Sequence, residues 1–169
     1  MKGRIELGDI TPHNLGQLKN VNSVIFPVSY TERFYKSVLE SGELAKLAYF
    51  EDVIVGGVAC RVDTDEPTGQ KHLYIMTLGC LSAYRRMGIG SLLLEHVLAV
   101  AKKREYLSTI MLHVQVSNDD AIGFYKKHGF EVKETKKDYY QRIEPTDAHV
   151  LVLPLKPAAA EAEAGAKAD

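Results

Sequence analysis

The sequence lacks the features that mark several large classes of protein. Its two cysteines share no Cys-x-x-Cys spacing and its six histidines form no cluster, which leaves a metal site without support. Lysine plus arginine number 21 and aspartate plus glutamate 22, so no net field favours nucleic acid or an anionic membrane. No apolar run reaches the roughly 18 residues that cross a bilayer, and the N-terminus has no signal-peptide core. We therefore expect a cytoplasmic or nuclear protein with no metal, no direct nucleic-acid partner and no membrane contact, in which Cys60 and Cys80 are small buried side chains.

The hydrophobic pattern predicts one α/β domain with a mixed sheet. The length of 169 residues suffices for a single sizeable core. Strand alternation and helical periodicity predict the order β-α-α-β-β-β-α-β-α-β-β, with Thr11 and Thr31 as the caps of the first two helices. The domain should span residues 1–156. Residues 157–169 are rich in alanine and glutamate without a bulky apolar side chain, which predicts a disordered tail.

The loop between the fourth strand and the third helix carries the clearest chemical signal. It reads Arg85-Arg86-Met87-Gly88-Ile89-Gly90-Ser91, and its two glycines let the backbone approach an anion closely. A helix that starts near Gly88 presents its first N–H groups and the positive end of its dipole to the loop. We expect a pyrophosphate cradle here, although a plain glycine turn has the same residues. The spacing is not that of a P-loop or a Rossmann fingerprint.

Two motifs together resemble a known superfamily. The spacing Arg85-x-x-Gly88-x-Gly90 is similar to the acetyl-coenzyme A loop of the GNAT acetyltransferases, and residues 118–130 resemble their N-x-x-A-x-x-F-Y-x-x-x-G-F signature. From about Ile5 to Leu153 the chain also resembles the N-alpha-acetyltransferases of the NatE type, called San for separation anomaly. Five segments carry that resemblance: Phe26-Pro27-Val28-Ser29-Tyr30, Leu73–Gly79, Leu112–Gln115, Tyr139-Tyr140 and Ile143-Glu144-Pro145.

The resemblance implies a fold and a co-substrate. It implies the GNAT fold, a mixed and mostly antiparallel sheet with flanking helices, in which the fourth and fifth strands splay apart to admit the pantetheine arm of acetyl-coenzyme A. It also implies that Asn118 lies beside that arm and that Tyr125 reaches the sulfur. The expected cofactor-binding residues are Leu78, Gly79, Arg85, Arg86, Met87, Gly88, Ile89, Gly90, Ser91, Asn118, Ala121 and Tyr125.

Three side chains are candidates for the acetyl transfer itself. A peptide α-amine has an ordinary pKa near 8, against about 10.4 for lysine, so a weak base acting through water suffices for an N-terminus. His113 and Tyr74 are the polar members of two apolar strands, and an imidazole can accept a proton at neutral pH. Tyr74 would orient the amine or a water, and Tyr125 would protonate the leaving thiolate. A backbone N–H near Leu78, where the strand should bulge, would polarise the thioester carbonyl. Ordinary core packing is the alternative for each of the three side chains.

The resemblance to the GNAT fold implies that the loop between the first two helices, with Phe26–Tyr30, faces the loop between the last two strands, with Tyr139–Ile143, across an acceptor groove. Proline fixes the backbone and aromatic rings give stiff walls, which suits an extended peptide with an apolar first side chain. The resemblance implies substrates that begin with methionine followed by a hydrophobic residue. The expected substrate-binding residues are Phe26, Pro27, Val28, Tyr30, Tyr74, Met76, His113, Tyr139, Tyr140 and Ile143.

Three functions are open at this point. The first is direct acetyl transfer to N-terminal amines of peptides or nascent chains in a ternary complex. Neither cysteine lies in a base-paired constellation, which disfavours a covalent enzyme intermediate. The second is a lysine or small-amine acetyltransferase. The third is a docking subunit, because the resemblance implies association with the ribosome-bound NatA acetyltransferase and a role in sister-chromatid cohesion.

Overall fold

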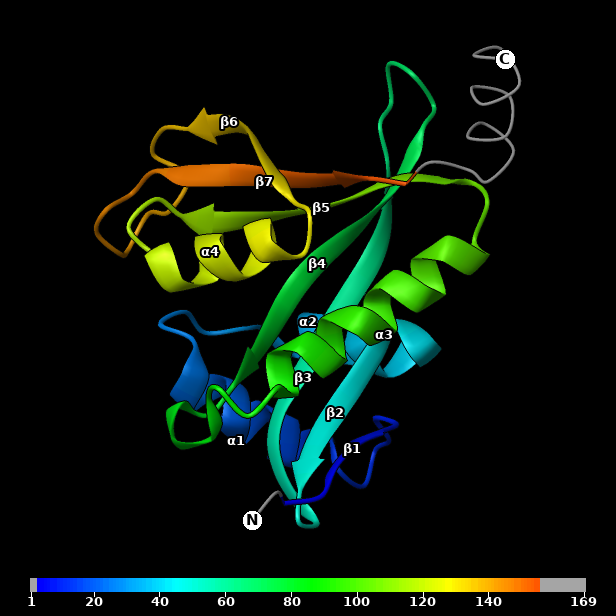
Figure 1. Cartoon of the computed structure of the whole chain (residues 1–169), viewed down its shortest axis with the longest axis vertical. Helices are drawn as coiled ribbons and strands as arrows, with labels where there is room; N and C mark the ends of the chain where they lie inside the picture. The colour runs from blue at the N-terminus through cyan, green and yellow to red at the C-terminus, as the bar shows by residue number, and fades with distance from the viewer. Residues whose placement is uncertain (1–2, 156–169) are drawn as a thin grey trace. The chain divides into compact units, whose positions relative to one another are not determined.

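The computed structural model describes residues 3–155, and their elements follow the predicted order (Figure 1). The tail predicted over residues 157–169 lies outside the described residues. The strands are β1 Ile5–Gly8, β2 Ala45–Phe50, β3 Val53–Thr64, β4 Lys71–Cys80, β5 Leu107–Gln115, β6 Glu131–Lys136 and β7 Ala148–Pro154. The helices are α1 Leu15–Ile25, α2 Glu32–Glu40, α3 Ile89–Lys103 and α4 Asp119–Lys127, with short 3-10 turns η1 Gly42–Leu44 and η2 Ser82–Tyr84.

Hydrogen bonds join the strands in the order β1-β2-β3-β4-β5-β7-β6. The pair β4–β5 is parallel, whereas β1–β2, β2–β3, β5–β7 and β6–β7 are antiparallel. The predicted mixed and mostly antiparallel sheet is therefore confirmed. The chain forms two compact units, one of residues 3–61 and 75–100 and the other of residues 62–74 and 101–155, so β3 and β4 each run from one unit into the other.

The first unit begins with an antiparallel meander. Its β2–β3 hairpin turns at Glu51 and Asp52, whose φ angles of 48° and 68° are both left-handed. Two such residues in succession match the right-handed twist of the flanking strands. Arg4 fastens the turn to the start of β1, because its backbone N–H donates to the Glu51 carboxylate at 2.6 Å and its guanidinium to Asp52 at 2.6 Å.

Helices α1 and α2 pack against the first unit's core. Leu18 of α1, Val38 of α2 and Leu47 of β2 are all buried in one apolar cluster. Thr31 caps α2 as predicted, since its hydroxyl accepts a hydrogen bond from the Phe34 N–H at 3.2 Å. The prediction that Thr11 caps α1 is wrong.

The first helix starts at Leu15, after Asn14, one turn later than expected. The Asn14 side chain accepts from the Thr11 N–H at 2.8 Å and donates to the Asp9 carbonyl at 2.9 Å. These bonds close a separate turn over Thr11–Asn14, and the Thr11 carbonyl then accepts from the Leu15 N–H at 3.0 Å. A short polar side chain that bonds nearby backbone groups competes with helix formation in this way.

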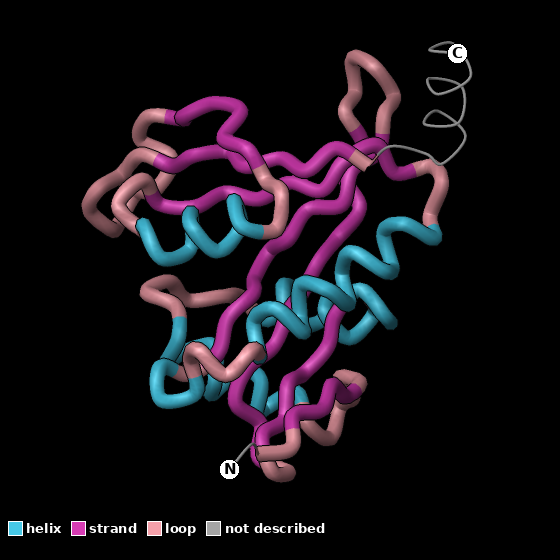
Figure 2. Tube along the Cα trace, viewed as in Figure 1, coloured by secondary structure: helices cyan, strands magenta, loops and turns pink. Residues whose placement is uncertain are grey.

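The second unit is built on β5, β7 and β6, which pair in that order (Figure 2). The parallel pairing of β4 with β5 runs from Lys71 opposite Leu107 to Tyr74 opposite Met111. Beyond those residues β4 continues to Cys80 and β5 to Gln115. The buried side chains of this unit include Leu73, Leu107, Ile110, Leu112, Tyr125, Phe130, Val150 and Leu151. No helix of residues 3–155 has the length and apolar character needed to cross a membrane.

Candidate functional site

The glycine loop of the first unit has the backbone of an anion-binding turn. Arg86 and Gly88 both adopt left-handed conformations, with φ of 65° and 88°, and α3 follows at once with Ile89. Backbone N–H groups around left-handed residues form a concave anion site, and the helix N-terminus adds its own. Ile89 is 1% exposed and fastens the helix start to the core, whereas Arg85, Arg86 and Gly88 are exposed. The loop thus combines two left-handed residues with a helix start, and its role as a pyrophosphate cradle stays a prediction.

The second unit brings Tyr74, His113 and Tyr139 together. The Tyr74 hydroxyl lies 2.7 Å from Nδ1 of His113, a hydrogen bond between two adjacent parallel strands. The Tyr139 ring stacks on the imidazole of His113, with the two ring centroids 4.2 Å apart and the ring planes at 5° to each other. Strand alternation explains this placement. On β4 the half-buried Tyr74 follows the buried Leu73, and on β5 the half-buried His113 follows the buried Leu112, so each polar side chain lies on the face opposite to its buried neighbour. Three residues far apart in the sequence therefore form one polar and aromatic group.

Helix α4 presents the second motif in the same unit. Asn118 caps the helix as predicted, and its side chain accepts from the Ala121 N–H at 3.2 Å. Tyr125 is 6% exposed, and its ring meets that of Phe130 edge-on at 5.4 Å. The aromatic part of Tyr125 thus has a packing role, and the assignment of its hydroxyl to the thiolate stays a prediction.

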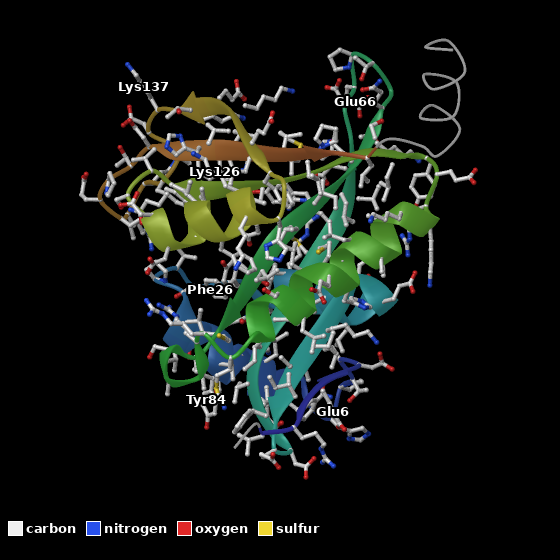
Figure 3. The ribbon with its side chains drawn as sticks, in the orientation of Figure 1. Glu6, Phe26, Glu66, Tyr84, Lys126 and Lys137 are labelled. Atoms are coloured by element: carbon white, nitrogen blue, oxygen red, sulfur yellow. The ribbon has the colours of Figure 1, made fainter. Side chains whose placement is uncertain are left out.

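An aromatic row in the first unit carries the predicted Phe26–Tyr30 segment. Phe26, labelled in Figure 3, follows α1, and its ring meets that of Tyr30 edge-on at 6.1 Å. Tyr30 in turn stacks on Phe34 of α2, with centroids 4.6 Å apart. Gly79 of β4 leaves room for this segment, because a Cβ there would lie 2.9 Å from Ile25 and 3.1 Å from Phe26. Phe34 was not predicted as a site residue, because nothing in the neighbouring sequence distinguishes it from an ordinary core residue.

The loop that follows β6 holds Tyr139, Tyr140 and Ile143. Burial raises the pKa of Tyr140 and the neighbouring Tyr139 raises it further, so the phenol of Tyr140 stays protonated at neutral pH. Tyr139 is 41% exposed, whereas Tyr140 and Ile143 are half-buried. A polar network closes the loop, and its side chains are those of Gln115, Asp138, Thr146 and Asp147. The sequence did not predict this network, because residues that lie apart in the chain form it.

The predicted site residues thus fall into two groups. Phe26, Pro27, Val28, Tyr30, Met76, Leu78, Gly79 and the loop from Arg85 to Ser91 belong to the first unit. Tyr74, His113, Asn118, Ala121, Tyr125, Tyr139, Tyr140 and Ile143 belong to the second. Within each group the structure shows the contacts above. The meeting of the two groups at one groove stays a prediction of the sequence.

The two thiols have environments that suppress reactivity. Cys60 is fully buried, which strongly raises its pKa, and the half-buried Cys80 also has a raised pKa through burial, offset in part by Arg85. Both are free cysteines. The burial predicted for Cys60 is confirmed, whereas the burial predicted for Cys80 is wrong, because Cys80 at the end of β4 is only partly covered. A thiol that is neutral at pH 7 is a poor nucleophile, so these sites do not favour an acyl-cysteine route. Among residues 3–155, no three His, Cys, Asp or Glu side chains are grouped to hold a metal.

Comparison with known proteins defines the class of protein first. Residues 15–130 match the family model described as the acetyltransferase (GNAT) family. The chain belongs to the GNAT acetyltransferase family.

Individual relatives narrow this assignment. The chain is 64% identical over 156 residues to N-alpha-acetyltransferase 50 of Danio rerio, covering 92% of each chain. It is 58% identical over 155 residues to the probable N-acetyltransferase san of Drosophila melanogaster, covering 92% of this chain and 83% of the relative. Arabidopsis thaliana Naa50, solved in complex with the bisubstrate analogue CoA-Ac-MVNAL, superposes with a TM-score of 0.82 at 47% identity, over 88% of this chain and 97% of that chain. The predicted resemblance to the San-type N-alpha-acetyltransferases is confirmed.

Proposed function

We propose that this chain transfers the acetyl group of acetyl-coenzyme A to the α-amine of peptides and nascent chains that begin with methionine followed by a hydrophobic residue. The observation that carries the proposal is the hydrogen-bonded pair of Tyr74 and His113 in a member of this family. The bisubstrate analogue bound by the Arabidopsis relative joins coenzyme A to a peptide that starts Met-Val, which supports the same substrate class here.

The main chain of residues 85–91 would hold the diphosphate of acetyl-coenzyme A. Two residues of this loop are left-handed and α3 starts directly after it, and backbone of this kind is suited to bind an anion, which supports the proposal. Arg85 and Arg86 add positive charge at the exposed rim. Asn118 and Ala121 would flank the pantetheine arm from α4. When bound, acetyl-coenzyme A supplies an activated acyl carbon, and side chains of this protein would accept and donate the protons.

The Tyr74–His113 pair would accept the proton that the α-amine loses as its nitrogen bonds to the acyl carbon. With the proton on Nδ1, His113 donates to the Tyr74 oxygen and Nε2 accepts; in the other tautomer Tyr74 donates to Nδ1. A water between amine and imidazole would complete the path. As the carbon–sulfur bond breaks, the Tyr125 hydroxyl would protonate the thiolate, and a backbone N–H near Leu78 would stabilise the developing oxyanion.

Two peptides distinguish N-terminal transfer from lysine transfer. A peptide that starts Met-Leu with a free α-amine should be acetylated, and the same peptide with a blocked N-terminus and an internal lysine should not. Activity on the blocked peptide alone would reverse the proposal in favour of a lysine acetyltransferase. His113→Ala should lower kcat by a factor of about a hundred or more, the usual contribution of a general base, while cofactor binding is retained.

A docking role can accompany this activity. We propose that the chain associates with the NatA acetyltransferase at the ribosome, in the cytoplasm and also the nucleus, with cohesion of sister chromatids as a downstream effect. The support is the San-type relationship alone. Turnover by the isolated chain tests whether docking is the main role, because an inactive isolated chain that gains activity only with NatA would make it so.

A further inference from the structure

The loop of residues 137–147 is closed by contacts between its two ends. The Thr146 hydroxyl donates to the Asp138 carboxylate at 2.9 Å, and the Asp138 N–H donates to the Asp147 carboxylate at 2.9 Å. The Tyr140 N–H donates to the Thr146 carbonyl at 2.8 Å. We refer to Asp138, Thr146 and Asp147 together as the loop clamp. Lys137, labelled in Figure 3, immediately precedes it.

The end of β5 and the residue that follows it both form hydrogen bonds to the same loop. The Gln115 side chain donates to the Pro145 carbonyl at 2.8 Å, and the Val116 N–H donates to the Asp147 carbonyl at 3.1 Å. Gln115 and His113 lie two residues apart on β5, so their side chains leave the strand on the same face. The loop is therefore fixed to the strand that carries the candidate base.

The clamp holds Asp138 in an unfavourable backbone conformation. The φ angle of Asp138 is 54°, in the left-handed region, which is uncommon for a residue with a side chain although Asp and Asn adopt it more readily than most. Such a conformation persists where surrounding bonds over-determine it. Both the N–H and the carboxylate of Asp138 are engaged by the clamp, and Asp138 immediately precedes Tyr139. The conformation of Asp138 therefore sets the direction in which Tyr139 leaves the chain.

The rings of Tyr139 and His113 stack face to face. The centroids are 4.2 Å apart and the planes differ by 5°, while the Tyr139 ring meets Tyr140 edge-on at 5.1 Å. Stacking against a flat partner restricts rotation of the imidazole about its second side-chain torsion, and the Tyr74 hydroxyl fixes which nitrogen faces β4. One ring and one hydroxyl thus restrict the orientation of His113.

We propose that Thr146 and Asp138 are positioning residues for the reaction, acting through Tyr139 on the imidazole of His113. This rests on the proposed function of His113 as a proton acceptor. Loss of the Thr146–Asp138 hydrogen bond releases the left-handed turn, Tyr139 leaves the imidazole, and the ring of His113 no longer holds one orientation. Misplacement of a reacting group by about an ångström can lower a rate about a hundredfold.

Four variants of the full chain test the proposal in matched pairs. Thr146→Val removes the donor and keeps the shape, whereas Thr146→Ser keeps the hydroxyl. Asp138→Ala removes the acceptor, whereas Asp138→Asn keeps an acceptor oxygen and a residue type that tolerates left-handed φ. We expect Thr146→Val and Asp138→Ala to lower kcat on a Met-Leu peptide by tenfold to a hundredfold, about what a misplaced group costs, with the KM for acetyl-coenzyme A unchanged. Thr146→Ser and Asp138→Asn should stay within about threefold of the wild type by the same argument.

A second readout does not depend on activity. In the wild type the stacked Tyr139 ring should shift the carbon-bound ring protons of His113 upfield in the NMR spectrum, with His113→Gln identifying the resonance among the six histidines. Thr146→Val and Asp138→Ala should lose this shift, and the two conservative variants should keep it. Thermal unfolding of each variant shows whether the fold is intact.

The two readouts separate the possible failures. A Thr146→Val or Asp138→Ala protein with an unchanged resonance overturns the proposal, whatever its kcat. A lost resonance shift with unchanged kcat also overturns it, because the orientation of His113 would not affect turnover. A wild type that shows the shift and the clamp dependence but acetylates no peptide overturns the proposed function itself.

Discussion

The Tyr74 hydroxyl and Nδ1 of His113 are 2.7 Å apart, and this hydrogen bond links two adjacent strands. A pair that shares a proton acts as a unit, so the effects of removing its members should not add. Tyr74→Phe deletes the hydroxyl and keeps the ring, and His113→Ala deletes the imidazole. The contact is short enough for direct transfer between the two side chains, in addition to any path through water.

We expect Tyr74→Phe to lower kcat about tenfold to a hundredfold and His113→Ala about a hundredfold or more. The double variant should be no slower than the slower single variant. Steady-state kinetics on a Met-Leu peptide measures all three. Tyr106→Phe is a matched control, because Tyr106 is 53% exposed and lies outside the proposed site. If the two losses multiply in the double variant, the two side chains act independently.

Local signals in the sequence account for the elements and for part of the site. Thr31 and Asn118 each accept a hydrogen bond from an N–H three residues ahead, and such caps can be recognised from adjacent residues alone. The glycine loop can likewise be recognised from a short motif, and in the structure Gly88 has a left-handed φ. The second left-handed residue of that loop, Arg86, was not expected, because arginine does not ordinarily mark this conformation.

Contacts between distant residues were beyond the reach of the sequence. The stacking of Tyr139 on His113 depends on how a loop returns to β5, and the Thr146–Asp138 bond that closes this loop has no local pattern. The start of α1 was missed for a related reason: Thr11 and Asn14 are both good caps, and the choice depends on Asn14 bonding the Thr11 N–H and the Asp9 carbonyl. Competing hydrogen bonds of similar strength decide such boundaries.

The conformation of Gly88 predicts a specific effect on cofactor binding. Gly88 has a φ of 88°, and a Cβ built there meets no atom within 4 Å, so Gly88→Ala is strained by its backbone alone. Relief of the strain should move the N–H groups of the loop, and we expect the KM for acetyl-coenzyme A to rise at least tenfold. Gly69→Ala is the matched control, because Gly69 has a φ of 72° and equally open surroundings in the turn between β3 and β4. Each should lose about 1–2 kcal/mol of stability. Calorimetry that gives Gly88→Ala the wild-type affinity for coenzyme A would contradict the cradle.

The ion pair of Asp9 with Lys46 predicts a pH-dependent contribution to stability. The hydrogen bond from Lys46 to the Asp9 carboxylate lowers the pKa of Asp9 below its ordinary value of 3.8, and the positive charge of Lys46 is the second cause of this shift. A carboxyl whose folded pKa is depressed stabilises the fold above its unfolded pKa and loses that contribution as the pH falls through the folded pKa. Asp9→Asn should therefore unfold at a lower temperature than the wild type at pH 7, by a small amount because Asp9 is solvent-exposed.

The difference should shrink below pH 3.8 and vanish at lower pH, as followed by circular dichroism. Glu66→Gln serves as the control, because Glu66 is an exposed carboxyl in the turn after β3, labelled in Figure 3. Its removal tests the loss of an exposed carboxyl that is not paired with Lys46, and the Glu66→Gln variant should unfold like the wild type at pH 7. A destabilisation of Asp9→Asn that persists unchanged at acid pH would show that the lost charge is not its cause.

The close contact of β3 with β4 in the first unit predicts a loss of stability from a single added methyl group. A Cβ at Gly56 would lie 2.4 Å from the Gly79 carbonyl oxygen and 2.9 Å from the Cys80 Cβ. Backbone atoms cannot turn aside as a side chain can, so Gly56→Ala must push the two strands apart where the Leu81 N–H donates to the Val55 carbonyl at 2.8 Å. We expect a loss of about 1–3 kcal/mol in the free energy of unfolding, the usual cost of overpacking. Gly16→Ala, at an exposed position in α1 where a Cβ meets no atom within 4 Å, should instead be neutral or gain up to about 1 kcal/mol through helix propensity. Urea unfolding measures both, and equal midpoints for the two variants would show that β3 and β4 are not packed backbone to backbone at Gly56.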